Sequence, residues 1–211
     1  FGIVAGGSIA SVSAANQTIP GDFLYPIKLV AEQTQLVLTK DKTDKLKLKT
    51  EFVARRTEEI KTIAASDIPQ KQERIKEAAE SVKRDLDTVK TQLNDVSKQE
   101  TVTRTAEAAK LVDQRSSELA ITLKDVRASV SEATRSSVTE AEVAAVNTGV
   151  KALQLLIDSH DDPASKDVIT NDELIRSIHG KVQGMEQNIA DAAFKLSVST
   201  SSHTTSQREQ N

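Results

Sequence analysis

Apolar residues recur along the middle of the chain at alternating steps of four and three residues, the spacing of one helix face. The clearest run lies between Gln70 and Gln99 and consists of Ile75, Ala79, Val82, Leu86, Val89, Leu93 and Val96. Heptads of this kind predict a long helix whose seam packs against near-parallel or antiparallel neighbours.

Three further stripes have similar spacing. The second comprises Val102, Ala106, Ala109, Val112, Ser116, Leu119, Leu123, Val126 and Val130. The third comprises Val143, Val146, Val150, Leu153 and Ile157, and the fourth Leu174, Ile178, Val182, Met185, Ile189, Ala192 and Leu196. The stripes can pair between chains, but short loops between antiparallel helices favour pairing within one chain.

Turn residues are scarce in the same region. Glycine is absent from Asp22 to Thr148 and proline from Gln70 to Asp162, and a helix is the structure that runs so far without either. We therefore expect an all-α, elongated bundle of about six long antiparallel helices. Capping boxes that begin at Ser97, Ser137 and Thr170 predict helix starts.

The first 21 residues carry no charge. A bilayer span needs about 20 apolar residues, so we interpret residues 1–17 as the end of a longer apolar segment. One interpretation is a transmembrane helix, and the other is a signal peptide with a small-residue cleavage site at Val12-Ser13-Ala14. Both place the rest of the chain outside the cytoplasm, anchored or secreted; a flexible leader is the third alternative.

The stretch TIPGDFLYPIK, Thr18 to Lys28, connects this segment to the first helix. Its Pro-Gly pair turns the chain, Asp22 can hold an Asx-type turn, and Pro26 fits the first turn of a helix. The buried face predicted for that helix consists of Leu24, Ile27, Ala31, Thr34 and Leu38. Phe23, Tyr25 and Lys28 match the belt of aromatic and basic residues found at membrane surfaces.

Seven residues of this stretch resemble the PGD-x-LYP-x-K signature of a bacterial family of uncharacterised extracytoplasmic domains. They are Pro20, Gly21, Asp22, Leu24, Tyr25, Pro26 and Lys28. The run from Glu51 to Ile60 is a second point of similarity, and the resemblance covers Thr18 to Ile63. It implies a helical fold that directly follows a membrane or signal segment, and no activity. Some members accompany regulators of alternative sigma factors, which implies a sensory or regulatory role as an alternative.

Composition excludes several classes of function. A net charge of -3 and 2% aromatic residues do not provide the basic stripe and stacking platforms of a nucleic-acid binder. The absence of cysteine excludes disulfides and thiolate chemistry. No nucleophile motif occurs in a supporting context. We therefore expect no enzyme and no cofactor; a site assembled from scattered carboxylates is a remote alternative.

Two clusters of charged residues are candidates for binding sites. Asp158, His160, Asp161 and Asp162 could together bind a divalent cation, but such a run is more often a solvated helix end and loop, and we favour that interpretation. A lysine-rich patch is formed by Lys40, Lys42, Lys45, Lys47 and Lys49. A solvated face is again favoured there over contact with anionic lipid or wall polymer.

These observations predict four parts. Residues 1–17 end a transmembrane or signal segment, and residues 18–66 form the helical hairpin that resembles the family. Residues 67–197 form a long-helix bundle, which is either continuous with the hairpin or separate from it. Residues 198–211 form a disordered tail. We expect a membrane-proximal, extracytoplasmic helical interaction or structural module that binds a protein or cell-envelope component. The alternative is an envelope sensor of a ligand or divalent metal that signals through its membrane segment.

Overall fold

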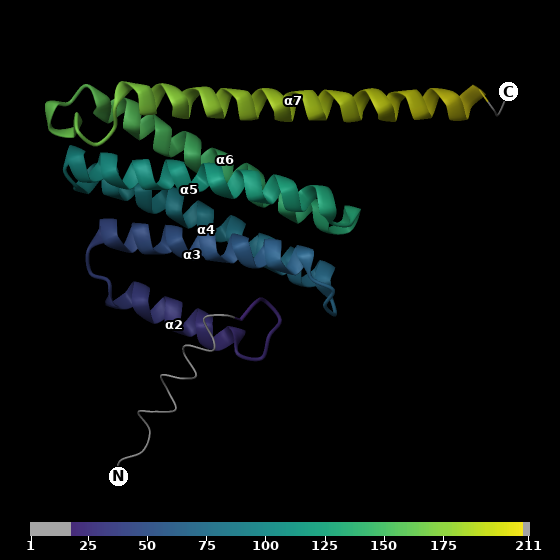
Figure 1. The fold of residues 1–211 in the computed structure, drawn as a ribbon, viewed down its shortest axis with the longest axis horizontal. Helices are drawn as coiled ribbons and strands as arrows, with labels where there is room; N and C mark the ends of the chain where they lie inside the picture. The colour runs from purple at the N-terminus through teal and green to yellow at the C-terminus, as the bar shows by residue number, and fades with distance from the viewer. Residues whose placement is uncertain (1–17, 209–211) are drawn as a thin grey trace, which may run out of the picture. The chain divides into compact units, whose positions relative to one another are not determined.

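The computed structural model describes residues 18–208, in which it places six α-helices, one short 3₁₀ helix and no β-strand (Figure 1). The helices are α2 (Tyr25–Leu38), α3 (Lys42–Ala65), α4 (Lys71–Gln99), α5 (Val102–Ser129), α6 (Glu132–His160), η1 (Pro163–Ser165) and α7 (Asn171–Arg208). The predicted all-α class and number of helices are confirmed. The predicted membrane or signal segment, residues 1–17, lies outside the described residues.

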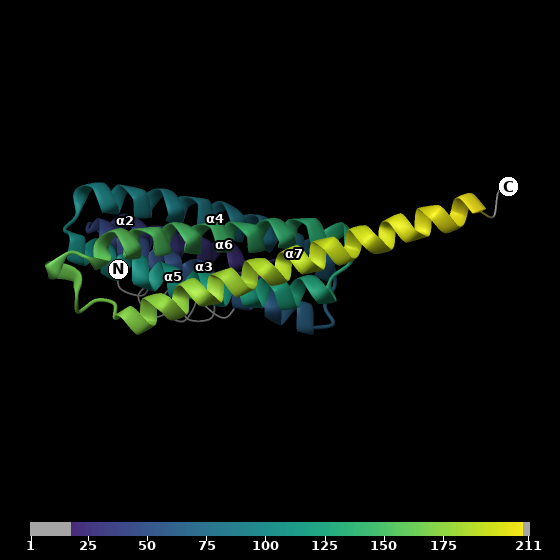
Figure 2. The same cartoon turned by 90° about the horizontal axis from the view of Figure 1, so that it is seen from above.

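The chain divides into two compact units, residues 1–170 and 171–211. Within the first unit, successive helices run in opposite directions with nearly parallel axes (Figures 1 and 2). Helix α3 packs on both α4 and α5, and α6 packs on the same two helices. The hairpin expected at residues 18–66 therefore continues directly into the bundle.

The second unit contains α7, which extends to Arg208. This differs from the disorder expected for residues 198–211, because the structure places 198–208 in helix. Apolar periodicity ends near Leu196, yet neither glycine nor proline follows Gly184, so nothing in the covalent chain interrupts the helix.

The core of the first unit follows the predicted seams of α4 and α5. All seven predicted positions of α4 are at most 1% exposed. Of the nine positions predicted for the second stripe, eight are buried, and the exception, Val102, begins α5. Regular heptads thus located the two central helices correctly.

Helix α6 buries a different face from the predicted one. Three of the five predicted positions, Val143, Val150 and Ile157, are exposed, so the prediction is wrong for them. Of the other two, Leu153 is buried as predicted and Val146 is half-buried. The buried face is instead rich in small residues, among them Ala141, Ala145, Thr148, Gly149 and Ala152. Small side chains allow helix backbones to approach closely, and the Thr148 hydroxyl accordingly donates to the Leu86 carbonyl of α4 over 3.4 Å.

Helix starts were predicted less well than helix faces. Ser97 and Ser137, two predicted caps, lie inside α4 and α6. The caps observed at helix starts include Thr101, whose hydroxyl accepts from the Arg104 amide over 3.4 Å, and Asp41, which accepts from the Asp44 amide over 3.0 Å. The third predicted cap, Thr170, directly precedes α7.

We predict that Ala145→Leu destabilises the bundle, because the position is fully buried and three more carbon atoms there would overpack the helix interface. Overpacking of this kind typically costs about 1–3 kcal/mol. Urea unfolding monitored by circular dichroism measures the change. Val150→Leu, on the exposed side of the same helix, is the control and should change stability by less than about 0.5 kcal/mol. Equal effects of the two substitutions would contradict the observed register of α6.

Candidate functional site

Helix α2 has its charged side turned inward and its apolar side turned outward. Lys28 and Glu32 are only 3% and 6% exposed, whereas Val30 is 67% exposed and Phe23, just before the helix, is 95% exposed. Ile27, Val37 and Leu38 are also exposed. The side expected to be buried was therefore predicted wrongly: Ile27, Thr34 and Leu38 are exposed, and Leu24 and Ala31 are half-buried.

The reason is a network of ion pairs beneath α2, centred on Arg56 of α3. The Arg56 guanidinium donates to Glu32 of α2 over 2.7 Å and also to Asp85 of α4. Its Nε donates to the Tyr25 hydroxyl over 3.3 Å. Lys49 of α3 forms a second ion pair with Asp85, at 2.5 Å. A buried arginine needs partners for its charge, and α2 supplies two of them.

Lys28 makes a second connection between α2 and α3. Its ammonium donates to the Glu59 carboxylate, to the Thr18 carbonyl over 3.2 Å, and lies 5.8 Å from the centre of the Tyr25 ring. The other carboxylate oxygen of Glu59 is buried and has no hydrogen-bond partner among the described residues. The two inward charges of α2 are therefore each paired with an opposite charge on α3.

This environment changes the acidities of its members. Burial raises the pKa of Tyr25 to about 12, although the nearby Arg56 acts in the opposite direction. Burial also raises the pKa of Glu32, again against the effect of Arg56 and Lys28. Burial alone would lower the pKa of Arg56, but Tyr25, Asp85 and Glu32 outweigh it and the pKa is raised.

Arg74 of α4 contacts the turn before α2 and holds it in place. Gly21 has a φ of +92°, and a Cβ placed there would lie 2.5 Å from Nε of Arg74. The Arg74 guanidinium donates to the Pro20 carbonyl and to Asp22, both over 3.3 Å. Asp22 accepts from the preceding Ile19 amide over 2.9 Å, whereas a predicted Asx turn would use a following amide. Pro26 occupies the first turn of α2, as predicted.

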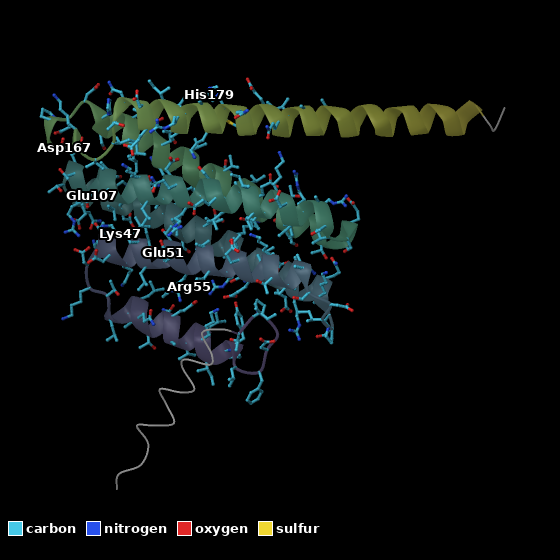
Figure 3. The ribbon with its side chains drawn as sticks, in the orientation of Figure 1. Lys47, Glu51, Arg55, Glu107, Asp167 and His179 are labelled. Carbon is cyan, nitrogen blue, oxygen red and sulfur yellow. The ribbon has the colours of Figure 1, made fainter. Side chains whose placement is uncertain are left out.

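Residues of the predicted lysine patch make contacts between helices. Lys49 pairs with Asp85, Lys42 donates to Gln99, and Lys47 lies 3.9 Å from Glu107 of α5. Farther along α3, Glu51 accepts from Arg115 of α5 over 3.0 Å. Lys47, Glu51 and Arg55 follow one another along this side of α3 (Figure 3).

A cavity of about 420 Å³ opens beside the network. Its charged lining residues are Lys28, Arg55, Glu58, Glu59, Arg115 and Glu118. Three cationic and three anionic side chains balance one another, so the lining does not favour a ligand of either charge.

The candidate metal residues are spread over a helix end and a loop. Asp158, on α6, accepts from the Gln154 amide side chain over 2.8 Å. Asp162 caps η1 by accepting from the Ala164 amide over 2.8 Å, while His160 ends α6 and Asp161 follows it. Within residues 18–208, no group of three or more His, Asp or Glu side chains is placed to hold a metal ion.

Comparison with protein families gives a match over part of the chain. Residues 17–102 match a family model described as a domain of unknown function (DUF5667). This range contains α2, α3 and α4, and with them every residue of the Arg56 and Lys28 networks. No curated protein and no solved structure matches the chain. None of the helices within residues 18–208 is both long and apolar enough to span a membrane.

We predict that Tyr25 ionises with a midpoint near pH 12 in the folded chain, because burial opposes the phenolate. An unfolded tyrosine ionises near pH 10, so Tyr25 stabilises the fold fully below about pH 10 and loses this effect as the pH rises toward 12. The chain has one tyrosine and no tryptophan, so ultraviolet absorbance follows this group alone. Circular dichroism recorded alongside verifies folding, and titration in urea is the control. A folded-state midpoint near 10 would show that the ring is not buried.

We predict a large loss of stability for Arg56→Ala, because the substitution leaves the buried Glu32 without its ion-pair partner and removes one of the two partners of Asp85. Removing one member of a buried ion pair typically costs about 3–5 kcal/mol. Arg84→Ala, at an exposed position of α4, is the matched control and should cost less than about 0.5 kcal/mol. Chemical denaturation near neutral pH measures both, and similar small losses would contradict the central position of Arg56.

Proposed function

We propose that this chain is a membrane-proximal, extracytoplasmic helical module without catalytic activity, and that it contacts the lipid surface through the outward side of α2. The observation that carries this proposal is the inverted orientation of α2, with its only two charged residues turned inward. The extracytoplasmic location rests on the charge-free residues that precede α2 and on the resemblance of the turn motif.

The outward side of α2 has the chemistry of a membrane-surface helix. Ile27, Val30, Thr34 and Val37 follow one another at steps of three and four residues, and all are exposed. No charge lies on this side, and Phe23 extends it toward the N-terminus. Contiguous exposed apolar surface marks interaction sites, and an amphipathic helix lies in the plane of a membrane with such a side in the lipid.

Chain order supports lipid as the partner. The charge-free segment ends at Gly21, four residues before α2 begins. If residues 1–17 end a membrane segment, α2 starts within a few residues of the bilayer surface, where aromatic residues such as Phe23 are favoured. The Arg56 and Lys28 networks then keep the apolar side of α2 turned away from the bundle.

The sensor alternative has weaker support. A metal sensor would use Asp158, His160, Asp161 and Asp162 as ligands. These side chains are not placed to hold a metal ion together. A small-ligand version could use the cavity beside Glu59, but the balanced charges of its lining indicate no ligand class.

The proposal predicts that the double variant Val30→Asp/Val37→Asp loses binding to vesicles. Flotation of the full chain with vesicles of phosphatidylcholine and phosphatidylglycerol measures the bound fraction. Replacing two inserted valines with charges should weaken partitioning about tenfold or more.

Val143→Asp/Val150→Asp is the matched control, because it places the same charges on two exposed valines of α6. It should bind vesicles as the unaltered chain does, with all three chains showing equal helix content by circular dichroism. If the two double variants bind equally well, residues outside α2 carry the membrane contact and the proposal fails.

A further inference from the structure

A small cavity beside the second half of α2 has a lining of one charge only. It lies where α2, α3 and α4 meet and has a volume of about 240 Å³. Its lining residues are Gln33, Leu36 and Val37 of α2, Lys45 and Lys49 of α3, and Thr88 and Gln92 of α4. Two lysines line it, and among the described residues no aspartate or glutamate does. In this it differs from the cavity beside Glu59, whose charges balance.

The two lysines can both serve an anion. Lys45 is half-buried, and its ammonium makes no ion pair or hydrogen bond with a described residue. Lys49 donates one hydrogen to Asp85 over 2.5 Å, but an ammonium has three to donate. A cleft lined by one sign of charge raises the local concentration of ions of the opposite sign. The cavity therefore favours an anionic group.

The polar groups of α4 add a requirement for a donor. The side-chain oxygen of Gln92 is buried and has no hydrogen-bond partner in the part of the chain that the structure describes. Buried acceptors in folded proteins are normally paired with a donor, and a hydroxyl on the bound group would supply one. A phosphate diester that carries a hydroxyl on its substituent meets both requirements, and a cavity below the ~300–1,000 Å³ of drug-sized pockets suits such a small group.

The rim of the cavity indicates where the phosphate comes from. Val37, which is 66% exposed, belongs to the outward side of α2 proposed above to contact lipid, and Leu36 lies next to it. A free phosphate ion gains nothing from an apolar rim. In a membrane, the phosphate of a lipid lies directly outside the apolar layer, at the depth where an amphipathic helix lies. Lipid is therefore the source that this position favours.

We propose that this cavity binds the headgroup of an anionic phospholipid of the phosphatidylglycerol type. Lys45 pairs with the lipid phosphate, Lys49 adds a second donor, and Gln92 accepts from a hydroxyl of the headgroup. This inference rests on the contact proposed between α2 and the lipid surface, and it names the class of lipid that the contact selects.

Short-chain lipids test the site without a bilayer. Amide chemical shifts of the labelled full chain are recorded with dihexanoyl phosphatidylglycerol below its micelle concentration. Saturable shifts should appear at Lys45, Thr88 and the side-chain amide of Gln92, and dihexanoyl phosphatidylcholine should cause none of them. Equal shifts with both lipids would overturn the proposal. The same shifts with millimolar inorganic phosphate, at matched ionic strength, would assign the cavity to free phosphate and overturn the lipid assignment.

Vesicle binding tests the selection of the lipid. Lys45→Gln should lower the preference of the full chain for phosphatidylglycerol vesicles over pure phosphatidylcholine vesicles about fivefold, since each basic residue near an anionic surface contributes to this extent. Lys40→Gln is the matched control, because Lys40 is exposed in the same lysine patch and lies outside the cavity. It should lower the preference clearly less, with equal helix content in all chains.

Equal losses from the two variants would show a diffuse attraction by the lysine patch and would overturn the site. Binding to the neutral vesicles measures the apolar contact of α2 separately. If the unaltered chain binds neutral and anionic vesicles equally well, the headgroup site fails while the proposed contact of α2 stands. If it binds neither, the proposed contact itself fails.

Discussion

The guanidinium of Arg56 is a charge placed almost entirely out of water, and much of the first unit is arranged around its neutralisation. Its partners come from two other helices, Glu32 from α2 and Asp85 from α4. Asp85 also pairs with Lys49. Because an unpaired buried charge costs several kcal/mol, α2 is held in the one orientation that presents Glu32 to Arg56. The outward position of the apolar residues of α2 follows from this constraint.

Such a network contributes more to orientation than to stability. Replacing a buried ion pair with apolar residues of similar volume is often neutral or stabilising, so an apolar inner side on α2 would have been an equally stable solution. That solution would leave α2 with an ordinary polar outer surface. The inward charges leave its apolar residues on the surface, which connects the network with the contact proposed for α2.

The sequence predicted the fold class and the seams of α4 and α5 because their apolar residues are large and regular, as at Leu86 and Leu123. It failed where burial depends on neighbours. On α6, the spacing of the larger valines predicts the wrong buried face, because close packing selects Ala145 and Gly149. On α2, a hydrophobicity pattern cannot reveal that Arg56, distant in sequence, draws charged residues inward. The spacing of Lys28 and Glu32, four residues apart and the only charges of that helix, was the available signal for the site.

Helix α2 contributes no buried apolar side chain to the bundle. Its release would therefore expose mainly ion pairs, together with half-buried groups such as the Tyr25 ring, to water. Regions held in this way belong to the part of a protein that opens locally before global unfolding. The single tyrosine, Tyr25, lies where α2 contacts Arg56 of α3. Its absorbance therefore reports whether α2 is packed on the bundle.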